Sequence, residues 1–483
     1  MSVNSMILCV CVCYFIGVIA VGMYASRRAK KASDYLVAGR QLGWVRTGIT
    51  LSAVQIGVGI VLSGATRGYD HGVWPGIYYT IGCGGGLIIA GLVTSKKLRS
   101  QEGFVPMDFF SRRYGDSRGI RFWSFLSNIP SLLGIFIAQI LACGGVLSGF
   151  GIPFHWGVVL TGAVVLLYCT VGGMWGVVMT DTIHVSVIMI GIPVFFILTA
   201  VKFIAAGGSL GAIYATPFIP QGKLSELIYL ALPFFLSISV SYDAYARIQS
   251  AKDIQSARKG CCLGGVIVLF IGLLCSSIGA MSHLLFPGVT DGIFTIAATG
   301  VLPPFISGVV IAAILAAAMS SANGVILSMG SCVARDFYNR FLHPEVSSLD
   351  ELPKAKRISQ ATVLIGSIVG IIFSFYMTDI LDAMIIFNYP YMGSLLIPML
   401  GGLMWDRATR KGAFAAAAAG GIIGVGAFFI GIPSPIQGMI NVDLALFIAY
   451  IVSTVVLVVV SLSDKEGQKV NDRMIAERRA NGN

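Results

Sequence analysis

Charged side chains are scarce in this chain of 483 residues. They make up 11% of it, and hydrophobic residues make up 56%, whereas ordinary soluble proteins carry about 25% charged residues. The scarcity excludes a typical soluble domain, and the high hydrophobicity excludes intrinsic disorder, which needs low hydrophobicity and dense charge. The composition therefore predicts an all-α polytopic membrane protein.

The chain also lacks the motifs of catalysis and of ATP-driven pumping. It contains no Walker A loop, no nucleophile elbow and no paired-carboxylate motif. Its ten cysteines and five histidines are dispersed. The spacing of two between Cys9, Cys11 and Cys13 rotates successive thiols by about 200° around a helix, which separates them. We therefore expect neither an enzyme nor a transition-metal site, and a carrier is the favoured class.

Apolar stretches long enough to cross a bilayer occur thirteen times, since a transmembrane helix needs about 20 apolar residues. They lie at roughly 5–25, 46–66, 73–95, 120–148, 156–172, 175–200, 225–245, 260–285, 304–333, 358–377, 380–404, 413–432 and 442–462. The loops between them are short, so no sizeable soluble domain is expected.

Basic residues predict the orientation. The first stretch is followed at once by four basic residues between positions 27 and 31, the reverse of a cleaved signal peptide, so we expect it to be retained with the N-terminus outside. Thirteen alternating spans then place 30 of the 33 Lys and Arg residues on the cytoplasmic side, and only Arg67, Lys202 and Lys223 outside. This agrees with the positive-inside rule. It predicts a multi-pass protein of the cell inner or plasma membrane, with its C-terminus inside and no nucleic-acid partner.

The second stretch is rich in glycine: Gly57, Gly59 and Gly64 lie among small and β-branched residues. Two interpretations are open. Glycines at this density lower the cost of breaking a helix in mid-membrane, where freed backbone groups face a cavity. They also allow neighbouring helices to pack closely.

The ninth stretch contains Ala317, Ser320 and Ser321 at positions i, i+3 and i+4, on one helical face. One carbonyl and two hydroxyls then converge, and uncharged oxygens suit a hard monovalent cation that must bind and leave. Alternatively, both serines bond back to carbonyls one turn earlier.

An acidic residue lies within the sixth stretch. The segment GGMWGVVMTDTIH predicts a tight cytoplasmic turn at Gly172 and Gly173, with Asp181 about two turns into the next helix. A carboxylate is costly there unless it faces the interior or a water-filled path. Asp181 is therefore a candidate for a cation path near the inner mouth, or it pairs with a basic loop.

In this order and spacing, several segments resemble the sodium/solute symporter family, the group of sodium-coupled proline, pantothenate, sialic acid and sugar carriers. The resemblance is carried by SDYLVAG from Ser33, GGMWGVVMTD from Gly172, ARIQSAKD from Ala246, AMSS from Ala318 and MWDRATRKGA from Met404. It implies two inverted five-helix repeats of the leucine-transporter type. We then expect an extra N-terminal helix and basic loop at 1–45, the repeats at 46–200 and 225–404, two C-terminal helices at 405–462 and a cytoplasmic tail at 463–483.

The resemblance also implies binding residues. The sodium site of the family matches five positions here: Ala53, Ile56, Ala317, Ser320 and Ser321. Gly59 and Ile60 replace the Glu and Gln of sugar carriers, which argues against a sugar substrate. The candidates for the substrate cavity are Gln55, Gln139, Tyr242, Asp243, Tyr245, Asn388 and Tyr389. Asp243 either meets a substrate amine, guards the pathway, or pairs with Arg247 one turn on.

These observations predict a sodium-coupled symporter that imports a small polar solute by alternating access, working as a monomer in the lipid bilayer with sodium as its only metal ion. An amino acid or a carboxylate is the expected solute, because the N-terminus of a broken helix favours a carboxylate. Two alternatives stay open. One is a proton-coupled symporter of the same fold with Asp181 or Asp243 as the relay, and the other is a transporter-like sensor.

Overall fold

The computed structural model describes residues 3–238, 240–346, 348–377, 389–430 and 444–480. These residues are helical and contain no strand longer than an isolated bridge, so the predicted all-α class is confirmed. The first part of the chain contains α1 (Val3–Ala25), α2 (Ala32–Val37), α3 (Trp44–Gln55), α4 (Val58–His71), α5 (Val73–Gly76), α6 (Tyr78–Ile89), α7 (Ser95–Ser100), α8 (Pro106–Tyr114), α9 (Arg118–Ser148) and α10 (Phe154–Ala205).

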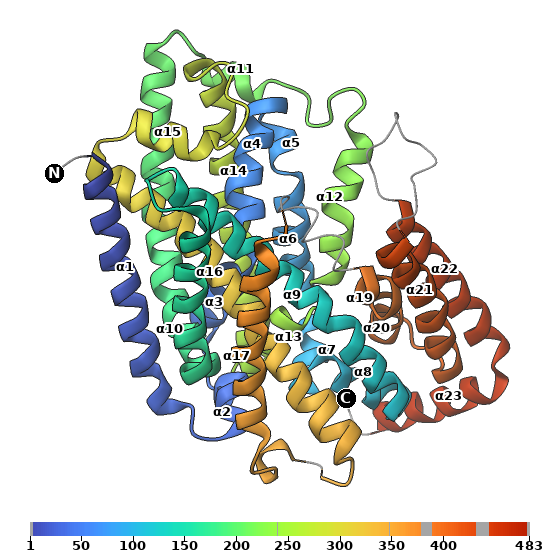
Figure 1. Cartoon of the computed structure of the whole chain (residues 1–483). Coiled ribbons are helices and arrows are strands. Elements are labelled where there is room, and N and C mark those ends of the chain that lie inside the picture. The colour runs from blue at the N-terminus through green and yellow to red at the C-terminus, as the bar shows by residue number, and fades with distance from the viewer. Residues whose placement is uncertain (1–2, 239, 347, 378–388, 431–443, 481–483) are drawn as a thin grey trace.

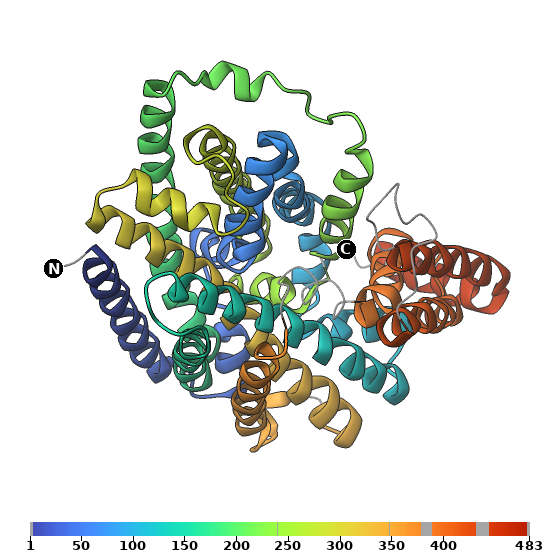
Figure 2. The same ribbon diagram turned by 45° about the horizontal axis from the view of Figure 1, so that its top comes forward.

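The second part continues the bundle and ends in three helices at one side of it. It contains α11 (Leu210–Tyr214), α12 (Leu224–Ser237), α13 (Tyr242–Ser250), α14 (Ile254–Leu285), α15 (Ile293–Val301), α16 (Pro304–Cys332), the π-helix η4 (Val333–Leu342), α17 (Ala355–Ser374), α19 (Tyr389–Ser394) and α20 (Leu396–Met404). The last helices are α21 (Arg410–Ile430), α22 (Leu444–Ser463) and α23 (Lys465–Ala480). In Figures 1 and 2, α21 and α22 lie at one side of the molecule beside α19 and α20.

Eight of the described helices are long and apolar enough to cross a membrane, and ten spans result when two bent helix pairs are each counted as one. One of the eight, α10, has 52 residues and would be about 78 Å long if straight, against a hydrocarbon core of about 30 Å. Gly173 interrupts it with non-helical angles, φ 54° and ψ −147°, at the predicted turn between the fifth and sixth stretches. The total of thirteen spans stays a prediction, because 378–388 and 431–443 lie outside the described residues.

The two bent pairs occupy corresponding places in the chain. The first pair, α3 and α4, is bent by 56°, and the second, α12 and α13, is bent by 41°. They begin the two segments that were expected to be five-helix repeats. Discontinuous helices at matching positions of two halves are what an inverted repeat places around a binding site at the bilayer midplane.

The long helix α16 is the core of the bundle. Almost every residue from Ser307 to Cys332 is buried, and the helix packs against α1, α3, α9, α10 and α17. The glycines in and just before α4 have both expected roles, namely close helix packing and the breaking of a helix. Gly68 packs on α14, where an added Cβ would lie 2.2 Å from the Ser276 carbonyl oxygen, whereas Gly57 forms the break itself.

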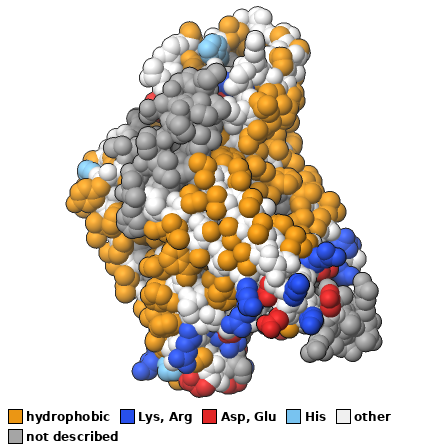
Figure 3. Space-filling model, turned by 90° about the vertical axis from the view of Figure 1, so that its right-hand side faces the viewer, with side chains coloured by type: hydrophobic (Ala, Val, Ile, Leu, Met, Phe, Trp, Pro, Cys, Tyr) orange, Lys and Arg blue, Asp and Glu red, His pale blue; other side chains and the backbone are white. Residues whose placement is uncertain are grey.

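Charged residues gather at one end of the molecule. On the face shown in Figure 3, Lys, Arg, Asp and Glu lie below a wide hydrophobic band, at the end where α2, α8 and α23 lie in Figure 1. The loop helices α11 and α15 lie at the opposite end. This one-sided distribution has the form that the positive-inside rule gives to a membrane protein.

Candidate functional site

The break between α3 and α4 frees backbone oxygens in the middle of the bundle. Ile56 ends α3 with ψ 74°, and Gly57 precedes α4 in an extended conformation. The carbonyls of Ala53 and Val54 then receive hydroxyl groups from α16 instead of backbone N–H groups. The Ser320 hydroxyl lies 2.8 Å from the Ala53 oxygen, and the Ser321 hydroxyl lies 2.8 Å from the Val54 oxygen.

Four of the five residues expected to hold sodium form one cluster. Ser320 contacts Ala53 and Ala317, and Ser321 follows it in the chain. Ser320 also lies 3.0 Å from the carbonyl oxygen of Ala317, so it joins one oxygen from each helix, and it bonds back along α16 as the alternative interpretation expected. Ser321 does not bond back but reaches across to α3. Ile56 is fully buried at the end of α3. The cluster is made of uncharged oxygens, which is the kind of ligand that binds a monovalent cation reversibly.

Gly57 is required here by space and not by its backbone angles. A Cβ at this position would lie 2.7 Å from the Ser321 Oγ and 2.9 Å from the Gln139 Oε1. The Gln139 side chain on α9 uses that oxygen to accept the Val58 N–H at 3.0 Å. The break is therefore held from two sides, by α16 through the serines and by α9 through the amide.

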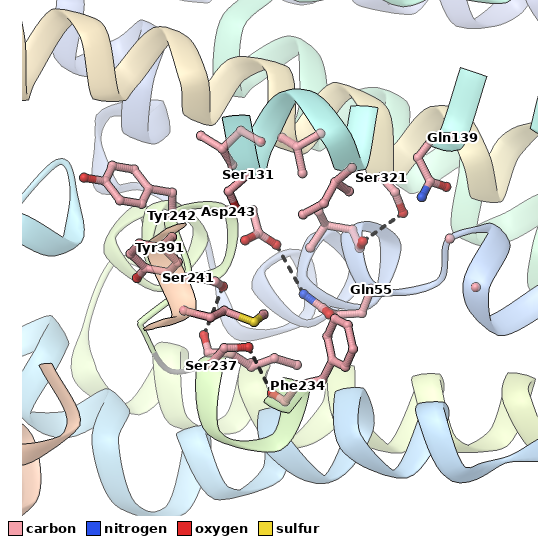
Figure 4. A pocket seen from close by; sticks show the side chains of 18 of the residues that line it. Gln55, Ser131, Gln139, Phe234, Ser237, Ser241, Tyr242, Asp243, Ser321 and Tyr391 are labelled. Atoms are coloured by element: carbon pink, nitrogen blue, oxygen red, sulfur yellow. Dashed lines mark hydrogen bonds between the residues drawn. The ribbon is translucent and has the colours of Figure 1, made fainter. Parts of the chain in front are cut away.

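A cavity of about 70 Å³ adjoins this cluster. Its polar and aromatic lining comes from α3, α6, α9, α12, α13, α16 and α19, namely Gln55, Tyr79, Asn128, Ser131, Gln139, Phe234, Ser237, Ser241, Tyr242, Asp243, Ser321 and Tyr391. In Figure 4, Gln55 and Asp243 point toward one another, with Ser321 and Gln139 on one side of them and Tyr242 and Tyr391 on the other. The Gln55 Nε2 donates to the Asp243 Oδ2 at 3.3 Å.

Four of the seven residues expected to face the substrate line this cavity: Gln55, Gln139, Tyr242 and Asp243. Tyr245, which lies one turn beyond Tyr242 on α13, is not among the described residues that line the cavity. There it is buried, and its hydroxyl packs so close to Gly103 that a Cβ on that glycine would lie 2.4 Å from it. Asn388 lies outside the described residues, and the side chain of Tyr389 is not described.

Sequence reasoning missed several lining residues. Two of them, Asn128 and Ser131, share one face of α9 with the expected Gln139, at i, i+3 and i+11. Polar residues at helical spacing within an apolar span were a usable signal for this face. Tyr79 and Tyr391 carried no such signal, because an aromatic residue in an apolar span looks the same whether it faces lipid, protein or a cavity.

Arg247 pairs with a different carboxylate from the one that spacing suggested. Its guanidinium lies 3.5 Å from the Asp181 carboxylate and reaches only the main-chain oxygen of Asp243. The side chains of Arg247 and Asp181 are both fully buried. Thr50 donates to Asp181 at 2.5 Å, and Asn323 donates to it at 3.2 Å. Asp181 is therefore compensated by an arginine of α13, not by a basic loop.

A second charged network lies toward the basic end of the molecule. The buried Arg121 of α9 contacts Asp108 at 3.1 Å and Asp336 at 2.6 Å, and Arg335 contacts Asp108 at 3.0 Å. Tyr242 of the cavity wall donates to Asp336 at 2.5 Å. Burial alone would raise the pKa of Asp108, but Arg335 and Arg121 outweigh it and hold that pKa well below its ordinary value. Asp108 therefore stays charged across the physiological range.

A much larger cavity, of about 740 Å³, lies at the other end. It is lined by α4, the end of α9 and the start of α15, and carries the charged or ionisable side chains of Arg67, Asp70, His71 and Asp291. The end that bears α11 and α15 thus contains a wide cavity, whereas ion pairs join the helices at the basic end.

Comparisons with known proteins agree with this architecture. Residues 35–423 match the family model described as the sodium:solute symporter family. The sodium/pantothenate symporter of Escherichia coli K12 is 26% identical over 443 residues, 85% of this chain and 88% of that protein. The osmoregulated proline transporter OpuE of Bacillus subtilis 168 is 24% identical and aligns over 95% of each chain.

The fold has solved counterparts. A substrate-bound, outward-open sodium-coupled sialic acid symporter superposes with a TM-score of 0.74 and 18% identity, over 94% of this chain and 97% of that one. Mhp1, a nucleobase-cation-symport-1 family transporter, superposes with a TM-score of 0.52 over 91% of this chain and 98% of that one, at 15% identity. At these identities the likeness concerns the fold.

Proposed function

Because the chain belongs to the sodium:solute symporter family, we propose a specific route by which its residues couple sodium to solute uptake. The family consists of transporters, and the activity of this chain is sodium-coupled solute symport, not enzymatic catalysis. What we infer beyond that activity is the sodium site, the solute cavity and the direction of transport.

Sodium is proposed to bind where Ala53, Ile56, Ala317, Ser320 and Ser321 meet. The observation that carries this proposal is the position of Ser320, whose hydroxyl lies within hydrogen-bond distance of carbonyl oxygens from both α3 and α16. When the hydroxyl hydrogens turn away, these oxygens are free to coordinate one cation. An ion there ties the broken helix to α16, and so binds one arrangement of the two elements better than another.

The solute is proposed to bind in the adjoining cavity of about 70 Å³. Ser321 lines this cavity and also belongs to the sodium cluster, so occupancy of one site orders the other. The 740 Å³ cavity at the opposite end from the ion pairs supports an outward-facing arrangement. Rocking of the bundle around the broken helices then exposes both sites to the other side.

The energetics are sufficient. One charge moving through about 100 mV releases about 2.3 kcal/mol, and a tenfold sodium gradient adds about 1.4 kcal/mol. At about 150 mV, the total of about 5 kcal/mol per sodium ion supports a solute gradient of about three thousandfold.

The gathering of charged residues at one end of the molecule supports an orientation in the membrane. The basic end is proposed to face the cytoplasm in a bacterial-type inner membrane or a plasma membrane, with the N-terminus outside, and the protein is proposed to work as a monomer. Arg67 and Lys223, two of the three basic residues expected outside, both contact Glu226 near the start of α12.

Sodium-driven uptake into proteoliposomes tests the site. We expect Ser320→Ala and Ser321→Ala each to raise the sodium concentration for half-maximal uptake by about tenfold or more, because each removes one oxygen ligand. Ser328→Ala is the matched control, since that serine lies on the same helix and bonds only back to Gly324, at 2.8 Å.

Two results would contradict the proposal. Unchanged sodium dependence in both serine variants would remove the sodium site. Uptake that ignores sodium and collapses with the pH gradient would replace sodium by protons as the coupling ion.

A further inference from the structure

The carboxylate of Asp243 has no cationic partner among the described residues. It lines the central cavity, and among the described side chains Gln55 donates a hydrogen bond to its Oδ2. Arg247, the nearest basic residue along α13, is committed to Asp181 and to the backbone of Thr50. An ionisable residue in the middle of a membrane is costly unless it is paired, so a cationic group of the solute would stabilise this site.

A positively charged nitrogen of the substrate fits beside the Asp243 carboxylate better than a second metal ion does. Gln55 presents its N–H group to Asp243, and a donor cannot share in coordinating a cation. The cavity walls near Asp243 are aromatic, with Tyr242 and Tyr391 rings 6.2 Å apart. Aromatic faces attract an organic ammonium group.

The opposite side of the cavity offers hydrogen-bond donors. Gln139 is 1% exposed and lines the cavity. Its Oε1 accepts the Val58 N–H, while no acceptor for its Nε2 group lies among the described residues. The 14-residue helix α4 begins here, and the positive end of its dipole together with the buried amide favours an anionic group.

From this pairing of a carboxylate without a described cation and an amide NH2 group without a described acceptor, we propose that the substrate is a small zwitterion. Its protonated amine binds Asp243 Oδ1, and its carboxylate binds the Gln139 Nε2 near the start of α4. The cavity of about 70 Å³ offers about five to seven water-sized positions, which suits an amino acid of modest size. This proposal rests on the proposed symport function and adds the class of its substrate.

The test compares two matched pools of solutes in sodium-loaded transport assays. One pool contains the twenty protein α-amino acids, and the other contains carboxylic acids with the same carbon skeletons but no nitrogen. We expect a sodium-dependent transport current with the first pool and none with the second. In Asp243→Asn, we expect the current with the first pool to fall at least a hundredfold, because the amide leaves the ammonium group without its counter-charge.

Two further measurements keep the outcomes separable. Asp406→Asn makes the same change of charge at an exposed position in the loop after α20. This control variant should leave the current unchanged. Thermal stabilisation by sodium alone, without solute, should persist in Asp243→Asn and shows that this variant is folded with its sodium site intact.

The proposal is overturned if the nitrogen-free pool is transported equally well, or if Asp243→Asn transports the amino acids normally. A response to neither pool overturns it as well. In that case, sodium stabilisation that persists in the unsubstituted protein would leave the proposed sodium site standing, whereas loss of both responses would count against the proposed function itself.

Discussion

At the scale of single residues, the break in the first bent helix pair depends on a position without a side chain. Gly57 lies where α3 stops and α4 starts, and both the Ser321 hydroxyl and the Gln139 amide occupy the space that a Cβ would take. The sequence showed that this stretch was rich in glycine but left open whether the glycines break a helix or pack one. The decision needed residues from α9 and α16, which are 82 and 264 positions away in the chain.

Gly57→Ala should therefore disturb sodium and solute binding together. A Cβ would lie 2.7 Å from the Ser321 Oγ and 2.9 Å from the Gln139 Oε1, so both partners of the break must shift. We expect the half-saturating concentrations of sodium and solute each to rise by about tenfold or more in the uptake assay. Gly17→Ala on α1, where nothing lies within 4 Å of the added Cβ, should behave as the unsubstituted protein. Normal uptake by Gly57→Ala would show that the break tolerates a side chain.

At the scale of elements, buried charge ties the broken helix to its surroundings. Arg247 of α13 donates to the carbonyl of Thr50 on α3 at 2.9 Å and faces Asp181 of α10. Asn323 of α16 holds the other oxygen of Asp181. Gly324 leaves room for the guanidinium, since a Cβ there would lie 2.7 Å from it. Sequence spacing along one helix pointed to Asp243 as the partner, and it could not reveal a carboxylate 66 residues away.

Arg247→Gln should destabilise the protein strongly, because it leaves the Asp181 carboxylate buried without a counter-charge. Breaking one side of a buried pair costs about 3–5 kcal/mol. We expect a clear fall in the melting temperature of purified Arg247→Gln, and partial recovery in the double variant Asp181→Asn with Arg247→Gln, which removes both charges. A double variant no more stable than Arg247→Gln alone would mean that the two side chains are not energetically coupled.

At the scale of the whole molecule, the two ends differ in a way that supports the proposed direction of transport. A cavity of about 740 Å³ opens the end that bears α15, while Arg121, Asp108, Asp336 and Arg335 join α8, α9 and η4 at the other end. Tyr242 links this network to the central cavity through Asp336. We propose that this network keeps the basic end closed while the solute binds.

Arg121→Gln should open that end. The substitution leaves Asp108 and Asp336 without their shared cation, so we expect a cysteine placed at Ser241 in the cavity wall to react at least tenfold faster with a membrane-impermeant maleimide applied from the basic side. Labelling of the same protein without the introduced cysteine is subtracted, because the chain has ten native cysteines. Lys411→Gln breaks an exposed ion pair at the same end and should leave the rate unchanged. An equal rate in Arg121→Gln would remove the network from the closure.

Several features of this protein were determined by the sequence alone. Long apolar stretches separated by short basic loops fix a polytopic helical protein, because hydrophobic segments of that length are stable only in a bilayer. The AMSS segment indicated sodium coupling through the resemblance to the sodium/solute symporter family. The spacing of Ala317, Ser320 and Ser321 along one helix showed only that their oxygens could converge. Span length and spacing are local properties, which the sequence displays directly.

Only the tertiary structure decided which residues meet. Tyr245 was excluded from the cavity wall and Tyr79 and Tyr391 were included, and Arg247 was assigned to Asp181, leaving Asp243 without a described cation. These outcomes depend on contacts between helices far apart in the chain, and a periodic pattern within one helix says nothing about its neighbours. The proposed binding site lies at the breaks of two helices, where local regularity ends and packing between elements determines the chemistry.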